Sequence, residues 1–184
     1  MLRNEVDRTK LSPVMLQWMN IKDENKDAII FFRLGDFYEM FFDDAIVASK
    51  ILELTLTGKQ AGLDEKVPMC GIPFKAYEAY LDKLVEMGYK VAIVEQVEDP
   101  KLTKEMVKRE VIQIVTSGTR LDGSIDDTKN NFLASVTYTA NSYTLSYADI
   151  STGEVYVTVL DDSLQELLQE IIRHGFEEII VSDE

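Results

Sequence analysis

Residues that bind metal ions or cross-link chains are scarce in this sequence. It contains one cysteine, Cys70, and one histidine, His174, among 184 residues. A disulfide within the chain is therefore impossible, and a structural zinc site needs more cysteine or histidine ligands than these two. Cys70 lies in an apolar setting, so we expect it to be a small buried side chain.

Long hydrophobic runs are missing as well. The first ten residues are rich in charge, so we expect no secretory signal peptide there. The longest stretch without a charged residue, 130–148, is rich in Thr, Ser and Asn and does not predict a membrane span. No phosphate-binding P-loop occurs either, because the glycine spacing around Lys59 is wrong and Gln60 follows that lysine.

Basic residues are few, and they are unevenly distributed. The chain has 33 acidic and 19 basic residues, a net charge of −14, which taken alone argues against binding to nucleic acid. Residues 1–120 hold 17 basic and 20 acidic residues, whereas residues 121–184 hold two basic and 13 acidic residues. This difference predicts two domains with different surfaces.

Aromatic residues concentrate in one short stretch, 31–42, which holds five phenylalanines and one tyrosine. Residues 28–34, which overlap the start of this stretch, are a short apolar run closed by Gly35 and predict a strand. From Phe37 onward the apolar residues recur at helical spacing, which predicts a helix. Asp36 stands where an N-cap belongs, and Glu39 follows three residues later, as in a capping box.

Phe37 has two interpretations at this position. Composition favours a packing role in the core, with Glu39 as a cap. The alternative is an aromatic wedge, because DNA-bending proteins insert apolar side chains between base steps from the minor groove. A mispaired step is cheaper to unstack, and Glu39 would then accept a hydrogen bond from a base edge that normal pairing hides.

The remaining patterns alternate between helix and strand and predict an α/β architecture. Ser12 and Pro13 mark the start of a helix whose Trp18 we expect in the core. In chain order we expect a strand at 52–57, a flexible turn at 58–62, extended backbone at 68–73, a helix at 74–87, a strand at 91–97, a short helical turn and a strand at 109–115.

A polar stretch without periodicity, 116–131, is the best domain boundary. We therefore predict a first domain at 1–116, a linker at 117–131 and a second domain at 132–184. The second domain should contain an antiparallel meander of strands at 132–139, 143–150 and 154–160, then a helix at 163–173 and a strand at 176–181.

Several segments of the chain resemble the MutS family of DNA mismatch-repair proteins. These segments are 12–15, 35–39, 41–45, 54–57, 68–73, 95–100, 107–111, 116–119 and 149–154, and they occur in the order found in that family. The resemblance implies a mixed-sheet mismatch-recognition domain followed by part of a ribonuclease-H-like α/β connector domain. It also implies that Phe37 stacks on the mispaired base and that Glu39 bonds to it.

Contacts with phosphate must supply most of the affinity, because stacking on one aromatic ring contributes only about 1–3 kcal/mol. The candidates are Lys59, Lys75, Lys108 and Arg109. Arg109 is favoured, because a guanidinium suits the geometry of phosphates and grooves. Lys75 stands where the family usually has histidine, so its contact would be a point charge.

The resemblance further implies an amino-terminal part of a longer, homodimeric, cytoplasmic protein associated with the nucleoid. ATP and magnesium are implied for the full-length protein only, and no enzyme activity, cofactor or metal site is expected in this chain. Mismatched duplex DNA is the expected partner, together with other mismatch-repair proteins through the connector region, and no membrane is expected.

Two other functions remain open from the residues alone. A ribonuclease-H-like fold can hold a metal on clustered carboxylates, so a metal-dependent nuclease would use Asp149, Glu154, Asp161 and Asp162. Acidic residues are common throughout this region, so their presence carries little weight. An acidic module that binds basic proteins without contacting DNA is the other alternative.

Overall fold

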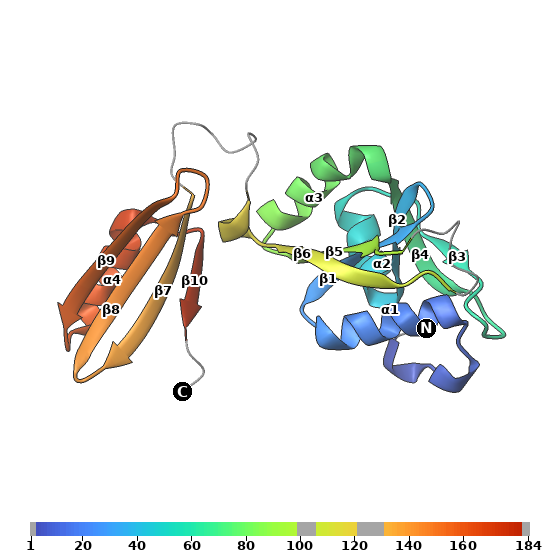
Figure 1. Cartoon of the computed structure of the whole chain (residues 1–184), viewed down its shortest axis with the longest axis horizontal. Helices are drawn as coiled ribbons and strands as arrows, with labels where there is room; N and C mark the ends of the chain where they lie inside the picture. Colours follow the sequence, from blue (N-terminus) through green and yellow to red (C-terminus); the bar gives the residue numbers. More distant parts are fainter. Residues whose placement is uncertain (1–2, 99–105, 121–130, 182–184) are drawn as a thin grey trace. The chain divides into compact units, whose positions relative to one another are not determined.

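The computed structural model describes residues 3–98, 106–120 and 131–181. They form two compact units, 1–115 and 116–184 (Figure 1). Of the predicted linker at 117–131, residues 121–130 lie outside the described ranges, and Ser117–Thr119 form a 3₁₀ turn that packs on the second unit. The helical turn expected after Asp99 also lies outside them.

The first unit is built on a six-stranded mixed sheet. In their order across the sheet, the strands are β3 (Thr57–Lys59), β4 (Val67–Pro73), β2 (Phe37–Phe41), β1 (Ala28–Leu34), β5 (Lys90–Gln96) and β6 (Arg109–Val115). Only β1 and β5 run parallel, and every other neighbouring pair is antiparallel. The mixed α/β fold class predicted from the sequence is therefore confirmed.

Helices cover both faces of this sheet, so β1 is apolar on both sides. The helices are α1 (Pro13–Glu24), α2 (Phe42–Ile51) and α3 (Tyr77–Glu86). Ile30 and Phe32 pack with Trp18 of α1, whereas Ile29 and Phe31 pack with residues of α2 and α3. Figure 1 shows α1 and α3 on opposite sides of β1, β5 and β6. A strand buried on both faces explains the continuous apolar run at 28–34.

The helix predicted from Phe37 onward exists, but its predicted start is wrong. Residues Phe37–Phe41 form β2, and α2 begins only at Phe42. Gly35, with φ of 59°, occupies the first position of a two-residue turn that pairs Leu34 with Phe37, and glycine is favoured at such a position. The aromatic residues of β1 and β2 therefore alternate between the two faces of a hairpin, and the helical spacing applies only from Phe42 onward.

The limits predicted for the strand at 52–57 and for the flexible turn at 58–62 are also wrong. Helix α2 continues to Ile51, and Glu53 adopts a left-handed φ of 56° just beyond its end. The strand that follows, β3, starts only at Thr57 and pairs with β4. Lys59 thus lies on an ordered edge strand rather than on a flexible tip.

Other elements match the sequence patterns closely. Strands β1 and β6 have the predicted limits, and Ser12 with Pro13 starts α1. Trp18 is fully buried, with its ring centroid 5.8 Å from that of Phe41. These patterns succeed because each depends on residues that are neighbours in the sequence.

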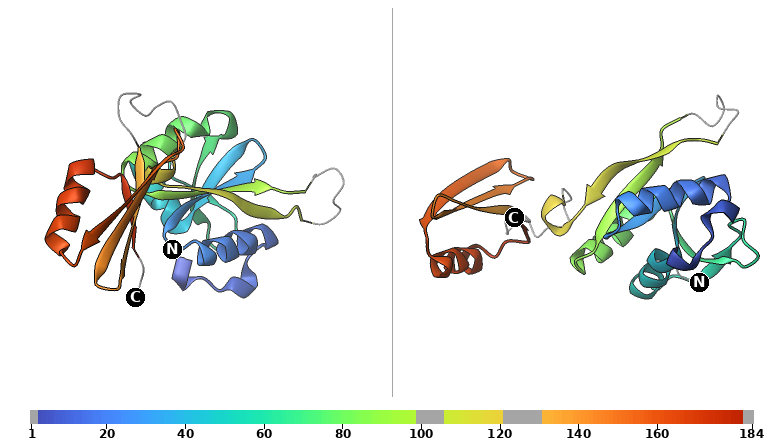
Figure 2. Two further views of the ribbon diagram at one scale, coloured as in Figure 1. Left: turned by 60° about the vertical axis from the view of Figure 1, so that its left-hand side comes forward. Right: turned by 90° about the horizontal axis from the view of Figure 1, so that it is seen from below.

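The second unit has a four-stranded sheet with one helix against it. The elements are β7 (Phe132–Thr139), β8 (Ser142–Asp149), β9 (Glu154–Asp161), α4 (Leu164–His174) and β10 (Glu178–Val181), and the strand order is β10-β7-β8-β9. The predicted meander is confirmed, and Gly175, with φ of 63°, ends α4. Figure 2 shows α4 along one face of the sheet. The relation of this unit to ribonuclease-H-like folds stays a prediction.

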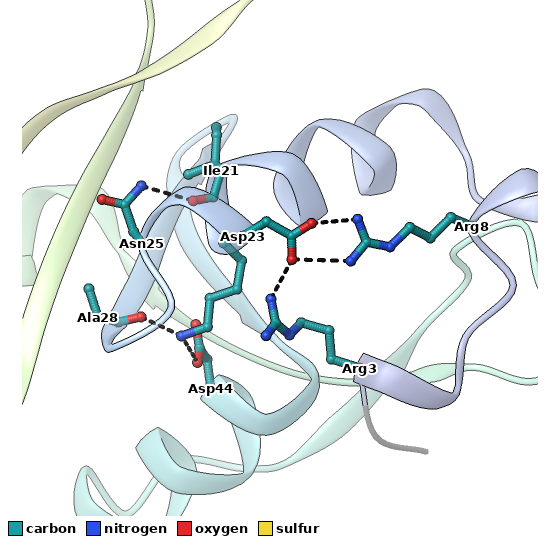
Figure 3. Close-up of polar contacts among 8 residues, drawn as sticks. Arg3, Arg8, Ile21, Asp23, Asn25, Ala28 and Asp44 are labelled. Carbon is teal, nitrogen blue, oxygen red and sulfur yellow. Dashed lines mark hydrogen bonds and ion pairs between the residues drawn. The ribbon is translucent and has the colours of Figure 1, made fainter.

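A buried ion pair joins α1, α2 and β1 in the first unit. The Lys22 ammonium lies 2.8 Å from Asp44 Oδ1 and donates to the carbonyl of Ala28. Asp44 Oδ2 accepts a hydrogen bond of 3.0 Å from the amide of Ile30. Burial raises the pKa of Asp44, and Lys22 opposes that shift. Figure 3 shows this contact beside the more exposed carboxylate of Asp23, which bonds to Arg3 and Arg8.

Removing the buried carboxylate should destabilise the first unit strongly. Asp44→Ala leaves Lys22 charged and buried and leaves the amide of Ile30 without its acceptor, at an expected cost of about 3–5 kcal/mol. Asp23→Ala is the matched control, because its partners are partly exposed, and it should cost about 1 kcal/mol or less. Urea unfolding followed by the fluorescence of Trp18 reports on this unit. Equal losses for the two variants would contradict the assigned role of Asp44.

The thiol of Cys70 should be unreactive in the folded chain. Its side chain is fully buried on β4, and burial raises its pKa to about 12. A thiol-specific reagent at neutral pH should therefore modify Cys70 only after unfolding. Rapid modification of the native chain, compared with a urea-unfolded control, would show that β4 is less well packed than described.

Candidate nucleic-acid interface

The hairpin of β1 and β2 positions Phe37 at its tip. Phe37 pairs with Leu34 on one side and with Pro73 of β4 on the other, and it remains 49% exposed. It is therefore not part of the hydrophobic core. Of the two interpretations of Phe37, the structure removes the one based on core packing and leaves an aromatic ring facing solvent.

Along one face of β2 the side chains become more exposed towards the hairpin tip. Phe41, Glu39 and Phe37 lie on the same face, because side chains alternate along a strand. Phe41 is fully buried, the side chain of Glu39 is 15% exposed, and Phe37 is half exposed. The buried end anchors the strand, and the free end presents an aromatic ring and a carboxylate two residues apart.

A hollow of about 400 Å³ lies beside the exposed ring. It is lined by Asp36, Phe37, Pro73, Phe74 and Lys75. The amide of Phe74 donates to the carbonyl of Asp36 over 2.8 Å, which ties the 3₁₀ turn at Phe74–Ala76 to the hairpin. The surface at this tip is thus hollowed, with apolar side chains flanked by one exposed aspartate and one exposed lysine.

Polar and aromatic contacts brace the opposite side of the hairpin. The hydroxyl of Tyr38 donates to the carboxylate of Glu95, and Arg33 Nη1 lies 3.3 Å from the same carboxylate. Burial and this hydrogen bond raise the pKa of Tyr38, so it stays a neutral donor. The Arg33 guanidinium also lies 3.3 Å from the ring centroid of Phe74. These contacts connect the hairpin to β5 and to the turn at Phe74–Ala76.

Glu39 forms an ion pair with Lys59, a contact that the sequence patterns did not reveal. Lys59 Nζ donates to Glu39 Oε2, and it also lies 5.7 Å from the ring centroid of Phe41. The two charged residues are 20 positions apart on strands separated by β4. No local pattern predicts such a contact, because it depends on the order of the strands.

Arg109 occupies an interior position, contrary to the exposed phosphate contact expected for it. It is buried, and its guanidinium donates to the carbonyls of Arg33 and Val107 and to the side chain of Gln17. Burial lowers its pKa. Arg109 therefore ties β6 to β1 and α1, and we do not include it in the interface.

The other two lysines differ in their surroundings. Lys75 is exposed at the rim of the hollow beside Phe37. Lys108 is also exposed, but it forms an ion pair with Glu110, and its amide donates to Glu98. The structure therefore places Lys75 beside Phe37 at the hairpin tip, whereas Lys59 of β3 pairs farther along β4 and reaches Glu39 with its side chain.

The carboxylates considered for a nuclease do not form a metal site in the described part of the chain. Within those ranges no group of three His, Cys, Asp or Glu side chains is arranged to hold a metal ion. Asp149 instead accepts hydrogen bonds from Ser151, Thr152 and the amide of Asn131, and these bonds lower its pKa.

No helix in the described ranges is long and apolar enough to cross a membrane.

Comparison with known proteins finds similarity to MutS proteins over both units. The family model described as MutS domain I matches residues 12–124, and the one described as MutS domain II matches residues 131–184. The chain is 52% identical over 174 residues to a DNA mismatch repair protein MutS of Caldicellulosiruptor bescii and 51% identical over 180 residues to that of Clostridioides difficile. The aligned parts cover 95% and 97% of this chain but only about a fifth of each relative.

Arg109 should act on stability rather than on DNA contact. Arg109→Met removes three hydrogen bonds and should lower the free energy of unfolding by about 2 kcal/mol or more. Lys108→Met, on the neighbouring exposed residue, should change it by less than about 0.5 kcal/mol. Urea unfolding followed by the fluorescence of Trp18 separates the two. A fully stable Arg109→Met chain would show that this residue is free for another role.

Proposed function

Because the chain belongs to the MutS family of DNA mismatch repair proteins, we propose that its first unit recognises mispaired or unpaired bases in duplex DNA. The observation that carries this proposal is the half-exposed ring of Phe37, held at the tip of a well-buried hairpin beside the carboxylate of Glu39. Recognition requires a contact that distinguishes a mispaired base from a paired one, and these two side chains supply it.

Phe37 acts as a wedge between base steps. Stacking of a base on an aromatic ring contributes about 1–3 kcal/mol, and unstacking costs least where base pairing is already lost. The hairpin is braced by Tyr38, Glu95 and Arg33, so little conformational freedom is lost on binding. The preference for a mismatch then comes mainly from the lower cost of deforming the duplex there.

Glu39 supplies the second part of the discrimination. A carboxylate accepts hydrogen bonds only, so it binds a base edge that presents a donor. In a paired duplex the donors of the Watson–Crick edge are engaged, so the carboxylate finds no donor there. A mispaired base exposes such a donor to Glu39. The position of Glu39 two residues from Phe37 on one strand face brings both groups to the same base.

Most of the affinity comes from phosphate contacts, for which Lys75 is the exposed candidate beside Phe37. The chain spans about a fifth of the length of the curated relatives it matches. We therefore assign to the full-length protein the remaining phosphate contacts, the homodimer and any role of ATP and magnesium, and we propose that it acts in the cytoplasm. No catalytic role is proposed for residues of this chain.

The second unit has a separate candidate function as a protein-binding surface. Residues 121–184 hold 13 acidic and two basic residues, a composition that disfavours contact with phosphate. Three valines on β9, Val155, Val157 and Val159, are also more than 60% exposed. An acidic surface with an apolar strand suits a partner protein better than DNA, and other mismatch-repair proteins are the proposed partners.

The wedge is tested by substitution of Phe37 in the full-length protein. Phe37→Ala should weaken binding to a single-mismatch duplex by about 5–100-fold, the loss of one stacking contact. Binding to the matched duplex at the same salt concentration should change by less than about twofold. The affinities are measured by fluorescence anisotropy with the two duplexes in parallel.

Tyr138→Ala is the matched control, because Tyr138 is an equally exposed aromatic residue, 51%, on a strand of the second unit. It should leave both affinities unchanged. If Phe37→Ala lowers stability while the preference for the mismatch persists, Phe37 is a packing residue and the proposal fails.

A further inference from the structure

We propose that Lys59 positions Glu39 and compensates its charge, so that a carboxylate can face DNA without repelling it. This inference rests on the proposed recognition of mismatched DNA by Phe37 and Glu39, and it adds a third residue to that site. It differs from the earlier expectation that Lys59 is itself a contact to phosphate.

The strand registers bring the two side chains to one face of the sheet. Glu39 pairs with Gly71 of β4, and Lys59 pairs with Val67 of the same strand. Residues paired across strands share a face, and Gly71 and Val67 are four positions apart, so all four residues lie on the same side. The Lys59 side chain therefore extends over β4 to reach Glu39.

Gly71 of β4 lies beside Glu39. A Cβ atom at position 71 would lie 3.6 Å from Glu39 Cγ and 3.4 Å from the carbonyl oxygen of Tyr38. These are ordinary contact distances, so the glycine lies directly against Glu39 on the face that it shares with Lys59.

The pair is shielded more than a typical surface ion pair. The side chains of Lys59 and Glu39 are 34% and 15% exposed, and the Lys59 ammonium is restrained further by the ring of Phe41. Charges in such a setting interact more strongly than fully hydrated ones. Loss of Lys59 would leave an uncompensated carboxylate at the surface that is proposed to face DNA.

The geometry divides the two oxygens of the carboxylate between two tasks. Lys59 occupies Oε2, and Oε1 has no hydrogen-bond partner among the described residues. Lys59 therefore fixes the orientation of the group and leaves one oxygen to accept from a base. A paired duplex then meets a neutral ion pair, whereas a mispaired base finds an acceptor already in position.

A double-mutant cycle in the full-length protein separates compensation from direct phosphate contact. The variants are Lys59→Met, Glu39→Gln and their combination, each measured against matched and mismatched duplexes at low and high salt. Lys59→Met alone should weaken binding to the matched duplex by about tenfold, because it exposes the charge of Glu39 to phosphates. In the Glu39→Gln background the same change should cost about threefold or less.

Three further measurements exclude a merely structural effect. Lys59→Arg should keep the matched affinity within about twofold, because it keeps the charge next to Glu39. The deficit of Lys59→Met should shrink as salt rises, because repulsion between exposed charges is screened. Lys50→Met, which removes the same charge from the exposed end of α2, is the matched control and should show neither effect.

Equal losses for Lys59→Met in the wild-type and Glu39→Gln backgrounds overturn the inference and return Lys59 to the role of a direct phosphate contact. That outcome does not affect the proposed function, which fails only if Phe37→Ala leaves the preference for the mismatch intact. A coupled loss that does not respond to salt also overturns the inference, because it indicates a structural role for the pair.

Discussion

The antiparallel pairing of β1 with β2 through the turn at Gly35 is the constraint on which the site depends. The turn sets Leu34 opposite Phe37 and Phe32 opposite Glu39. Because side chains alternate along a strand, a shift of one residue would move Phe37 and Glu39 to the opposite face of the sheet and Tyr38 to theirs. Such a shift is opposed by the fully buried residues at the other end of β2 and by the bond from Tyr38 to Glu95. The same packing that stabilises the core therefore determines which residues reach the surface.

In the first unit, charged side chains inside or near the core are each paired with a neighbouring group, whatever the net charge of the chain. The buried carboxylate of Asp44 is paired with Lys22, and the mostly buried carboxylate of Glu39 is paired with Lys59. The guanidinium of Arg109 donates hydrogen bonds to backbone carbonyls inside the unit. A protein with an overall charge of −14 can thus present a nearly neutral apolar tip, whereas the strongest acidic excess lies in residues 121–184. This separation makes a DNA-facing role for the first unit compatible with the composition of the whole chain.

Much of the fold could be predicted from the sequence, because the patterns are local. The apolar run of β1, the Ser-Pro start of α1 and the glycine end of α4 follow from neighbouring residues. The helix wrongly predicted from Phe37 shows where local patterns fail, since Tyr38, Phe41 and Phe42 fit helical spacing although Gly35 turns the chain back into a strand. Phe37 and Glu39 were selected by their motif, and their exposure is known only from the fold. The burial of Arg109 and the contact of Lys59 with Glu39 depend on strand order, which no local pattern encodes.

The ring at position 37 is proposed to reach the mispaired base. A photo-crosslinking analogue of phenylalanine incorporated at position 37 of the full-length protein tests this directly on a duplex with one mismatch. We predict crosslinks confined to the mispaired nucleotide and its immediate neighbours, and their loss on the matched duplex. Crosslinks spread evenly along both duplexes, or no more frequent than from the same analogue at position 138, would contradict the account.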